Sequence, residues 1–96
     1  MAYAREKALL SGWGRTKIEY FLKSKKLEQS AIDSAFDDID RERAANRMEE
    51  VIRRKWVSLS SLSKDQMAKR REKTLRFGMA RGYNYEEVRS IIKKLE

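Results

Sequence analysis

Residues 73–92 read KTLRFGMARGYNYEEVRSII and predict two helices joined by a tight turn. Apolar residues recur at helical spacing on both sides of Gly82, and glycine is the residue that most often follows the end of a helix. Asn84 is a good N-cap for the second helix, with Glu87 three residues later. Ser63 and Gln66 form a similar capping pair, which predicts the start of the first helix. The stripe that the second helix is expected to bury consists of Tyr85, Val88, Ile91, Ile92 and Leu95.

An earlier segment, residues 17–36, reads KIEYFLKSKKLEQSAIDSAF and follows the same pattern when it is shifted by 56 positions. The shift pairs Lys17 with Lys73, Phe21 with Phe77, Lys25 with Arg81, Leu27 with Tyr83, Ile32 with Val88, Ser34 with Ser90 and Phe36 with Ile92. We therefore predict two copies of a three-helix unit, residues 1–39 and 40–96, each with a core too small to be secure alone. Chance similarity between two amphipathic helical hairpins is the alternative explanation.

The remaining boundaries complete a prediction of about six helices. A first helix runs from Ala2 to Leu10, and a turn bracketed by two glycines separates it from a second helix that ends at residues 25–27. In that second helix Ile18, Phe21 and Leu22 share one face. A third helix starts near Ser30, and Asp40 caps a fourth that runs to Trp56. The fold class is thus all-α, an elongated array of tandem three-helix repeats.

Several classes of function have no support in the composition. The 96 residues include no Cys and no His, so the usual nucleophile, general base and soft metal ligands are missing. Asp37, Asp38 and Asp40 are the only candidates for a metal, but they crowd one helix end and Asp40 has a capping role there. We expect no enzymatic activity, no cofactor and no metal. No apolar run reaches the roughly 20 residues of a membrane span, so we expect a cytoplasmic monomer without membrane contact.

Positive charge is concentrated in the second half of the chain. Residues 1–50 contain 10 basic and 10 acidic residues, whereas residues 51–96 contain 13 basic and 5 acidic ones, which accounts for the net charge of +8. This asymmetry predicts a polyanionic partner. The predicted basic surface comprises Lys25, Lys26, Arg53, Arg54, Lys55, Lys69, Arg70, Arg71, Lys73, Arg76 and Arg81. A purely solvated face is the alternative, as is stabilisation of helix dipoles by Arg53, Arg54, Lys55 and Arg81.

Aromatic residues lie beside these cations in the sequence, namely Tyr20, Trp56, Tyr83 and Tyr85. They could stack on unpaired bases, or they could seal the edge of the core with the polar tip in water. Sequence-specific reading of duplex DNA is disfavoured, because the N-terminal turn of the last helix offers Glu86 and Glu87 where base contacts would need Arg, Asn or Gln.

Three groups of residues resemble the RecX family of RecA regulators, and together they span nearly the whole chain. They are Tyr3 and Ala4; then Gly14, Arg15, Ile18, Leu22, Lys25, Leu27, Ile32 and Ala35; then Phe77, Arg81, Gly82, Tyr83 and Val88. The last group is similar to that family's arginine, glycine, aromatic signature. Two positions depart from the pattern: Lys26, where the family's middle repeat often has glycine, and Gly78, where its last repeat often has leucine.

The resemblance implies tandem three-helix repeats, here the middle and C-terminal ones without a counterpart of the first, as in a piece or a shortened member. It implies binding to the RecA protein and to the RecA–DNA filament, with inhibition of its recombinase and ATPase activities. Recombination, DNA repair and the SOS response would then be the processes affected. The alternative is a stand-alone, non-specific nucleic-acid-binding module, and a third possibility is an adaptor for an acidic protein.

Overall fold

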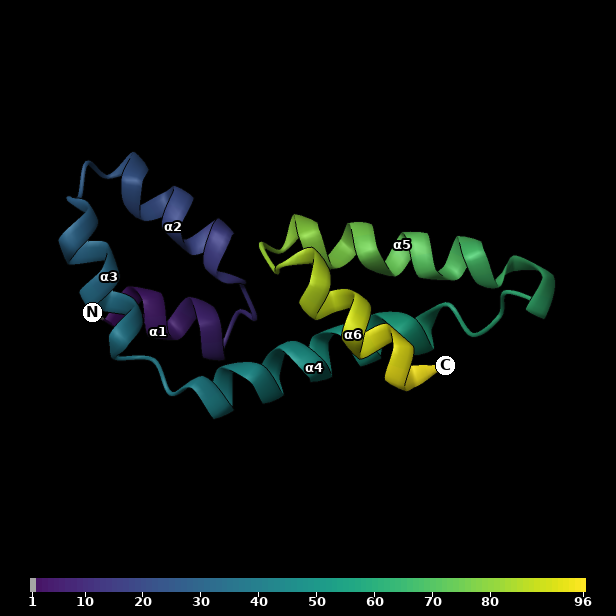
Figure 1. The fold of residues 1–96 in the computed structure, drawn as a ribbon. Helices are drawn as coiled ribbons and strands as arrows, with labels where there is room; N and C mark the ends of the chain where they lie inside the picture. Colours follow the sequence, from purple (N-terminus) through teal and green to yellow (C-terminus); the bar gives the residue numbers. More distant parts are fainter. Residues whose placement is uncertain (1) are drawn as a thin grey trace.

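The computed structural model describes residues 2–96, which form an elongated body of 47 × 23 × 18 Å (Figure 1). These residues contain six α-helices, one short 3-10 turn and no strand. The helices are α1 (Ala2–Leu9), α2 (Arg15–Ser24), α3 (Gln29–Asp37), α4 (Arg41–Ser58), α5 (Met67–Ala80) and α6 (Tyr85–Leu95), and the turn η1 (Lys64–Gln66) precedes α5. The prediction of an all-α, elongated helical array is confirmed.

Side-chain caps begin the helices of the second half as the sequence predicts. The Asp40 carboxylate accepts a hydrogen bond from the amide of Arg43 at 3.1 Å. The Asn84 side-chain oxygen accepts from the amides of Glu86 and Glu87, at 2.9 and 3.4 Å. Ser63 forms a capping box, but the box opens η1, so α5 itself begins one turn later than expected. Each cap satisfies amides that a helix start leaves without a partner.

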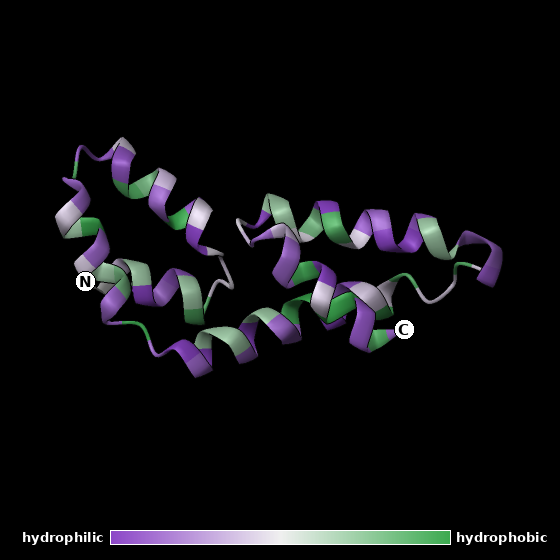
Figure 2. Ribbon diagram, viewed as in Figure 1, coloured by the Kyte–Doolittle hydropathy of each residue, from purple (hydrophilic) through white to green (hydrophobic). Residues whose placement is uncertain are grey.

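Two separate clusters of buried side chains hold the molecule together. The first lies among α1, α2 and α3, here called the N-terminal triplet, and consists of Ala4, Ala8, Ile18, Leu22, Ile32 and Ala35. The second lies among α4, α5 and α6, the C-terminal triplet, and consists of Val51, Ile52, Trp56, Tyr83, Val88, Ile91 and Ile92. In Figure 2 the hydrophobic segments of α4 and α6 gather where these two helices meet. That the triplets are copies of one unit, divided at residues 39 and 40, stays a prediction.

Two aromatic residues that helical spacing places on apolar faces are exposed in the structure. Tyr85 is 46% exposed, contrary to the prediction, because it is the first residue of α6 and lies at the rim while the neighbouring Tyr83 is buried. Phe21 is 37% exposed, with its ring centre 5.0 Å from that of Trp13. Ile18 and Leu22, which share its face of α2, are 1% exposed and carry that helix's contribution to the core.

The two triplets are joined where the end of α5 meets the start of α2 (Figure 1). The amide of Gly14 donates to the carbonyl of Arg81 at 2.7 Å, and the amide of Thr16 donates to the carbonyl of Gly82 at 3.2 Å. Amides at a helix start and carbonyls at a helix end lack partners within their own helices, so each set satisfies the other. The arrangement also places the partly negative end of one helix dipole at the partly positive end of the next.

Glycine is required on both sides of this end-to-end contact. A Cβ atom on Gly14 would lie 2.2 Å from the carbonyl carbon of Gly82. Gly82 has φ +91°, and a Cβ atom there would lie 2.5 Å from the Cβ of Lys17. The backbones could not approach this closely with any side chain in between.

The two positions that depart from the family pattern have contrasting environments. Lys26 has φ 63°, so it adopts the left-handed conformation of a glycine in the turn between α2 and α3. Gly78 is buried under α6, and a Cβ atom there would lie 2.7 Å from a methyl group of Val88. A leucine at position 78 would therefore push α6 away from α5.

Replacement of Lys26 by glycine should stabilise the protein. The side chain of Lys26 is exposed, so little contact is lost, and the strain of a left-handed lysine is relieved. We expect the free energy of unfolding in urea to rise by about 1 kcal/mol. Lys25→Gly is the control, because Lys25 has φ −90° and ψ 11° and glycine there should cost about 0.5–1 kcal/mol. Equal effects of the two substitutions on the free energy of unfolding would contradict the presence of backbone strain at Lys26.

Substitution of Gly14 by alanine should weaken the joint between the triplets. Gly14 has φ −80° and ψ 168°, which alanine adopts without strain, so the substitution tests the contact with Gly82 alone. We expect a loss of about 2–3 kcal/mol in the free energy of unfolding. Thr16→Ala, which keeps the amide that bonds Gly82, should cost far less. A Gly14→Ala protein as stable as the parent would show that the joint does not bear on stability.

Candidate binding surface

Three cations project together from the side of α5 that faces away from the core, and they are here called the α5 outer face: Lys69, Lys73 and Arg76. They are spaced by four and three residues, which places them on one side of a helix, and all three are exposed. Within the described residues, Lys69 and Lys73 form no ion pair. Arg76 lies 2.7 Å from Glu72, but this pair is so exposed that it adds little stability and leaves the guanidinium available.

Arg70, which the sequence placed beside this surface, turns inward instead. Its Nε and Nη2 donate to the carbonyl of Trp56 at 3.1 and 2.7 Å, and its guanidinium lies 3.9 Å from the centre of the Trp56 ring. The carbonyl belongs to the last turn of α4, where cations are favoured, and it also accepts from the amide of Leu59 at 3.1 Å. Arg70 therefore helps to end α4 and to cover the core.

Arg81 is likewise used inside the molecule, at the joint between the triplets. It donates through Nη2 to the carbonyl of Ser11 at 2.5 Å and through Nε to the carbonyl of Gly12 at 3.3 Å. Arg47 donates to the carbonyl of Leu10 at 3.2 Å, so two guanidinium groups meet the carbonyl end of α1. This geometry fits the prediction that Arg81 stabilises a helix dipole, although the helix is α1, which belongs to the other triplet.

The other predicted cations are divided between paired and free side chains. Arg71 forms an ion pair with Glu96, and Arg54 lies 2.5 Å from Glu50. Lys55 lies over the ring of Phe77, 5.3 Å from its centre. Arg53 is exposed and, within residues 2–96, forms no ion pair. Lys25 and Lys26 are exposed in the turn after α2, at the far end of the body from the start of α5 (Figure 1).

Tyr83 is the buried aromatic of the joint. Its hydroxyl donates to the carbonyl of Gly12, the same carbonyl that Arg81 Nε contacts. Burial raises the pKa of Tyr83, and the nearby positive charge of Arg81 partly opposes that rise. The side chain is 8% exposed and Trp56 is 4% exposed, so neither can offer a ring face to a base. Of the four aromatics considered for stacking, Tyr20 and Tyr85 are exposed.

A second group of aromatic rings and cations lies at the start of α2, and the sequence did not single it out. Trp13, Lys7 and Lys17 are half-buried there, whereas Tyr20 and Phe21 are exposed. Trp13 has two lysines over its ring, Lys7 at 4.7 Å and Lys17 at 4.4 Å from the ring centre. Phe21 extends the group toward Tyr20, with ring centres 5.8 Å apart. Phe21 was assigned to the core by its spacing, and Trp13 lies between two glycines, which mark only a turn. The sequence feature that could have predicted this group is the run of aromatic and basic residues from position 13 to 23.

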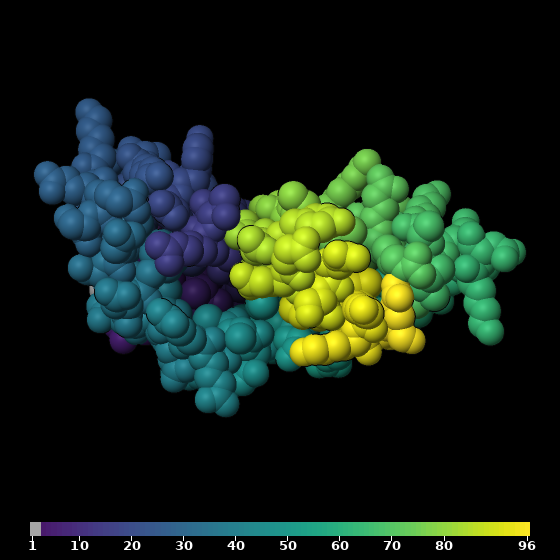
Figure 3. All heavy atoms as spheres, in the orientation of Figure 1, coloured from purple at the N-terminus to yellow at the C-terminus, as the bar shows by residue number. Residues whose placement is uncertain are grey.

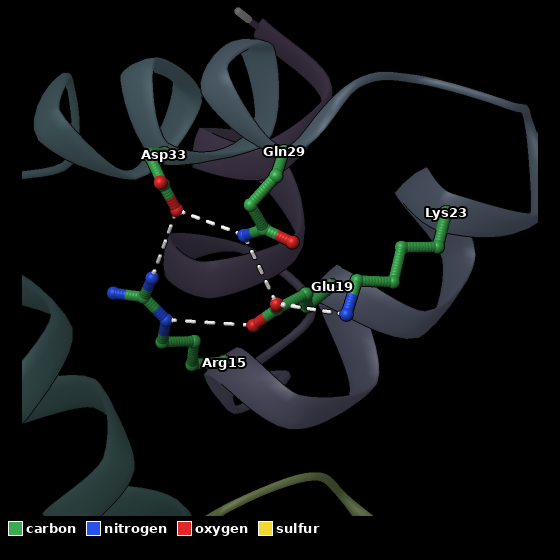
Figure 4. A network of polar contacts seen from close by, with 5 residues as sticks. All are labelled: Arg15, Glu19, Lys23, Gln29 and Asp33. Carbon is green, nitrogen blue, oxygen red and sulfur yellow. Dashed lines mark hydrogen bonds and ion pairs between the residues drawn. The ribbon is translucent and has the colours of Figure 1, made fainter.

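The acidic side chain of α2 is directed to α3 (Figure 4). Glu19 lies 3.3 Å from Lys23 and 3.6 Å from Arg15, and it accepts a hydrogen bond from Gln29 of α3. The hydrogen bond from Lys23 is the main reason that the pKa of Glu19 is lowered, followed by that from Gln29. Asp33 completes the network by contacting both Arg15 and Gln29. The network ties α2 to α3 and neutralises the acids there.

A cleft of about 490 Å³ lies between the two triplets. Its lining draws on both of them, with Trp13 and Phe36 from one and Met48 and Tyr83 from the other. Figure 3 shows the two lobes on either side of the boundary. The lining also includes two arginines and two acids, so the cleft does not favour a polyanion as the α5 outer face does.

Two further classes of site were sought among residues 2–96. No group of three or more acidic side chains there is arranged to hold a metal ion, and Asp40 of the acidic cluster is engaged in capping α4. None of the described helices combines the length and apolarity needed to cross a bilayer.

The chain is 33% identical over 82 residues to the regulatory protein RecX of Clostridium tetani (strain Massachusetts / E88). The aligned region covers 85% of this chain and 38% of that protein, so the chain spans well under half the length of its relative. No family model matches the chain, and no solved structure matches it.

The buried hydroxyl of Tyr83 should make stability depend on alkaline pH. Because its pKa is raised above the unfolded value of about 10, its contribution is complete below pH 10 and is lost as the pH rises through the folded pKa. Tyr83→Phe should lower the free energy of unfolding by about 1 kcal/mol at pH 7. Urea denaturation of both proteins should show this difference shrinking above pH 10. A difference between the two proteins that stays constant with pH would show that ionisation of Tyr83 is not linked to folding.

Proposed function

Because the chain belongs to the RecX family, we propose that it is a regulator that binds the RecA filament and inhibits its recombinase and ATPase activities. The relative that supports the family is a longer protein, and its name describes a regulatory role. The proposal transfers that role to the part of the family represented here. Which of the family's repeats the two triplets correspond to is part of the same proposal, with the middle and C-terminal repeats as our assignment.

The α5 outer face is the observation that supports a docking role best. Arg70 and Arg81 donate to carbonyls within the molecule, whereas Lys69 and Lys73 are exposed and form no ion pair within residues 2–96. A protein gains nothing in its own fold from unpaired like charges one helical turn apart, which repel each other. Their natural complement is a surface of carboxylates or phosphates on a partner.

The shape of the body suits a partner with repeated subunits. An extent of 47 Å with a width of 23 Å and a depth of 18 Å allows contact with more than one subunit of a filament. Inhibition would follow if the bound body occupied the path of a second DNA strand or blocked the addition of further RecA. Electrostatic attraction would contribute chiefly to the rate and orientation of association.

Charge reversal of the α5 outer face should weaken filament binding. The triple substitution of Lys69, Lys73 and Arg76 by Glu lowers the net charge by six, from +8 to +2. We expect co-sedimentation with RecA–DNA filaments to weaken by about 10-fold or more, since each exposed ion pair contributes up to about 1 kcal/mol. Inhibition of the RecA ATPase should fall in parallel, and circular dichroism should show unchanged helix content.

A matched control separates this face from net charge. Arg5, Arg41 and Arg43 are exposed and form no ion pair within the described residues, and their reversal to Glu also lowers the net charge to +2. The control should retain most of the binding. Equal losses in the two variants would mean that net charge, and not the α5 outer face, determines affinity. Binding of bare DNA without any binding of DNA-free RecA would instead favour the stand-alone nucleic-acid module.

A further inference from the structure

We propose that the start of α2 carries a platform that binds the unpaired bases and the phosphates of single-stranded nucleic acid. The α2 platform consists of the rings of Trp13, Tyr20 and Phe21 and the ammonium groups of Lys7 and Lys17. It is distinct from the α5 outer face and does not depend on any contact with RecA.

The rings form a continuous row, in which Trp13 is half-buried against the N-terminal core and Tyr20 and Phe21 are exposed. Trp13 and Phe21 have ring centres 5.0 Å apart, and Phe21 and Tyr20 have ring centres 5.8 Å apart with their planes at 80°. Tyr20 is 70% exposed and Phe21 is 37% exposed. Aromatic side chains are normally buried or kept at the core edge, so the exposed rings of Tyr20 and Phe21 are available for stacking. Any base can stack on such a ring because every base has a π-face.

Two lysines give the row its positive charge. Lys7 and Lys17 both lie over Trp13, and within residues 2–96 neither forms an ion pair with a carboxylate. Glu19, the acid of the same helix, is engaged by Lys23, Arg15 and Gln29 on the side of α3. A phosphodiester chain supplies anions for the lysines and flat apolar surfaces for the rings, which is the combination that single-strand binding sites use.

The platform continues from the α5 outer face. The last residues of α5 contact the first residues of α2 end to end, and Lys17 lies directly against Gly82 at that contact. Figure 1 shows α5 and α2 following one long edge of the body. A single strand that binds both surfaces would therefore run along α5 and on to α2. Phosphate contacts would prevail on α5 and base stacking on α2.

Tyr20→Ala tests the platform, because Tyr20 is the most exposed of its rings and its loss should not affect folding. Binding of an oligothymidine of about 16 nucleotides would be measured at low salt by anisotropy and by tryptophan quenching. Quenching reports mainly on Trp13, since Trp56 is 4% exposed. We expect Tyr20→Ala to weaken binding by about 10-fold, with Tyr20→Phe close to the parent. Tyr85→Ala is the matched control, a 46% exposed tyrosine on α6, and it should bind normally.

A duplex of the same length distinguishes stacking from charge. Duplex bases are already stacked on one another, so Tyr20→Ala should leave duplex affinity unchanged while the α5 reversal weakens it. Unchanged oligothymidine affinity in Tyr20→Ala would overturn the proposal, as would equal losses for oligothymidine and duplex. If Tyr20→Ala binds DNA-free RecA more weakly but binds oligothymidine normally, the rings contact a protein partner. That result would also overturn the proposal.

The same proteins keep this proposal separate from the regulatory one. If filaments are not bound or inhibited but oligothymidine binding depends on Tyr20, the platform stands and the RecA role fails. If filaments formed on DNA are inhibited equally by the parent and by Tyr20→Ala, and oligothymidine affinity is equal as well, the platform fails and the RecA role stands.

Discussion

Two backbone hydrogen bonds, from the amides of Gly14 and Thr16 to the carbonyls of Arg81 and Gly82, join the two halves of this molecule end to end. They require the backbones of two turns to touch, which only glycine permits, and they give partners to two amides at the start of α2 and two carbonyls after α5. The end-to-end order of α5 and α2 along one edge of the body depends on this contact (Figure 1). Each triplet supplies its own core, and the joint turns two small cores into one array.

The basic residues serve two different purposes, which the net charge does not distinguish. Arg47, Arg70 and Arg81 direct their guanidinium groups to carbonyls at or near helix ends, where a planar group with several donors can satisfy more than one acceptor. The lysines of α5 have no such role, since an ammonium group on a flexible stem is easily kept in water. A positive charge on this chain is therefore evidence of a binding surface only after the structural arginines have been set aside.

Helix boundaries were predictable from local chemistry, and the uses of individual side chains were less so. Asp40 and Asn84 cap helices as their positions imply, and the stripe of Val88, Ile91 and Ile92 is buried. Spacing alone could not show that Tyr85 lies beyond the rim of the core. Nor could it show that Arg70 turns toward Trp56 or that Arg81 reaches the other triplet. Those outcomes depend on neighbours distant in sequence, as does the gathering of Trp13, Lys7 and Phe21 beside Tyr20.

A coupling made of main-chain groups has a consequence for how such proteins can change over generations. Its donors and acceptors are common to every residue, and the side chains of Arg81 and Tyr83 add hydrogen bonds to the carbonyls of Ser11 and Gly12. A gene segment encoding one triplet could be duplicated, deleted or exchanged, and the new neighbour would fit if it kept the two glycines and these two side chains. Length could then vary among descendants while each surface evolved separately.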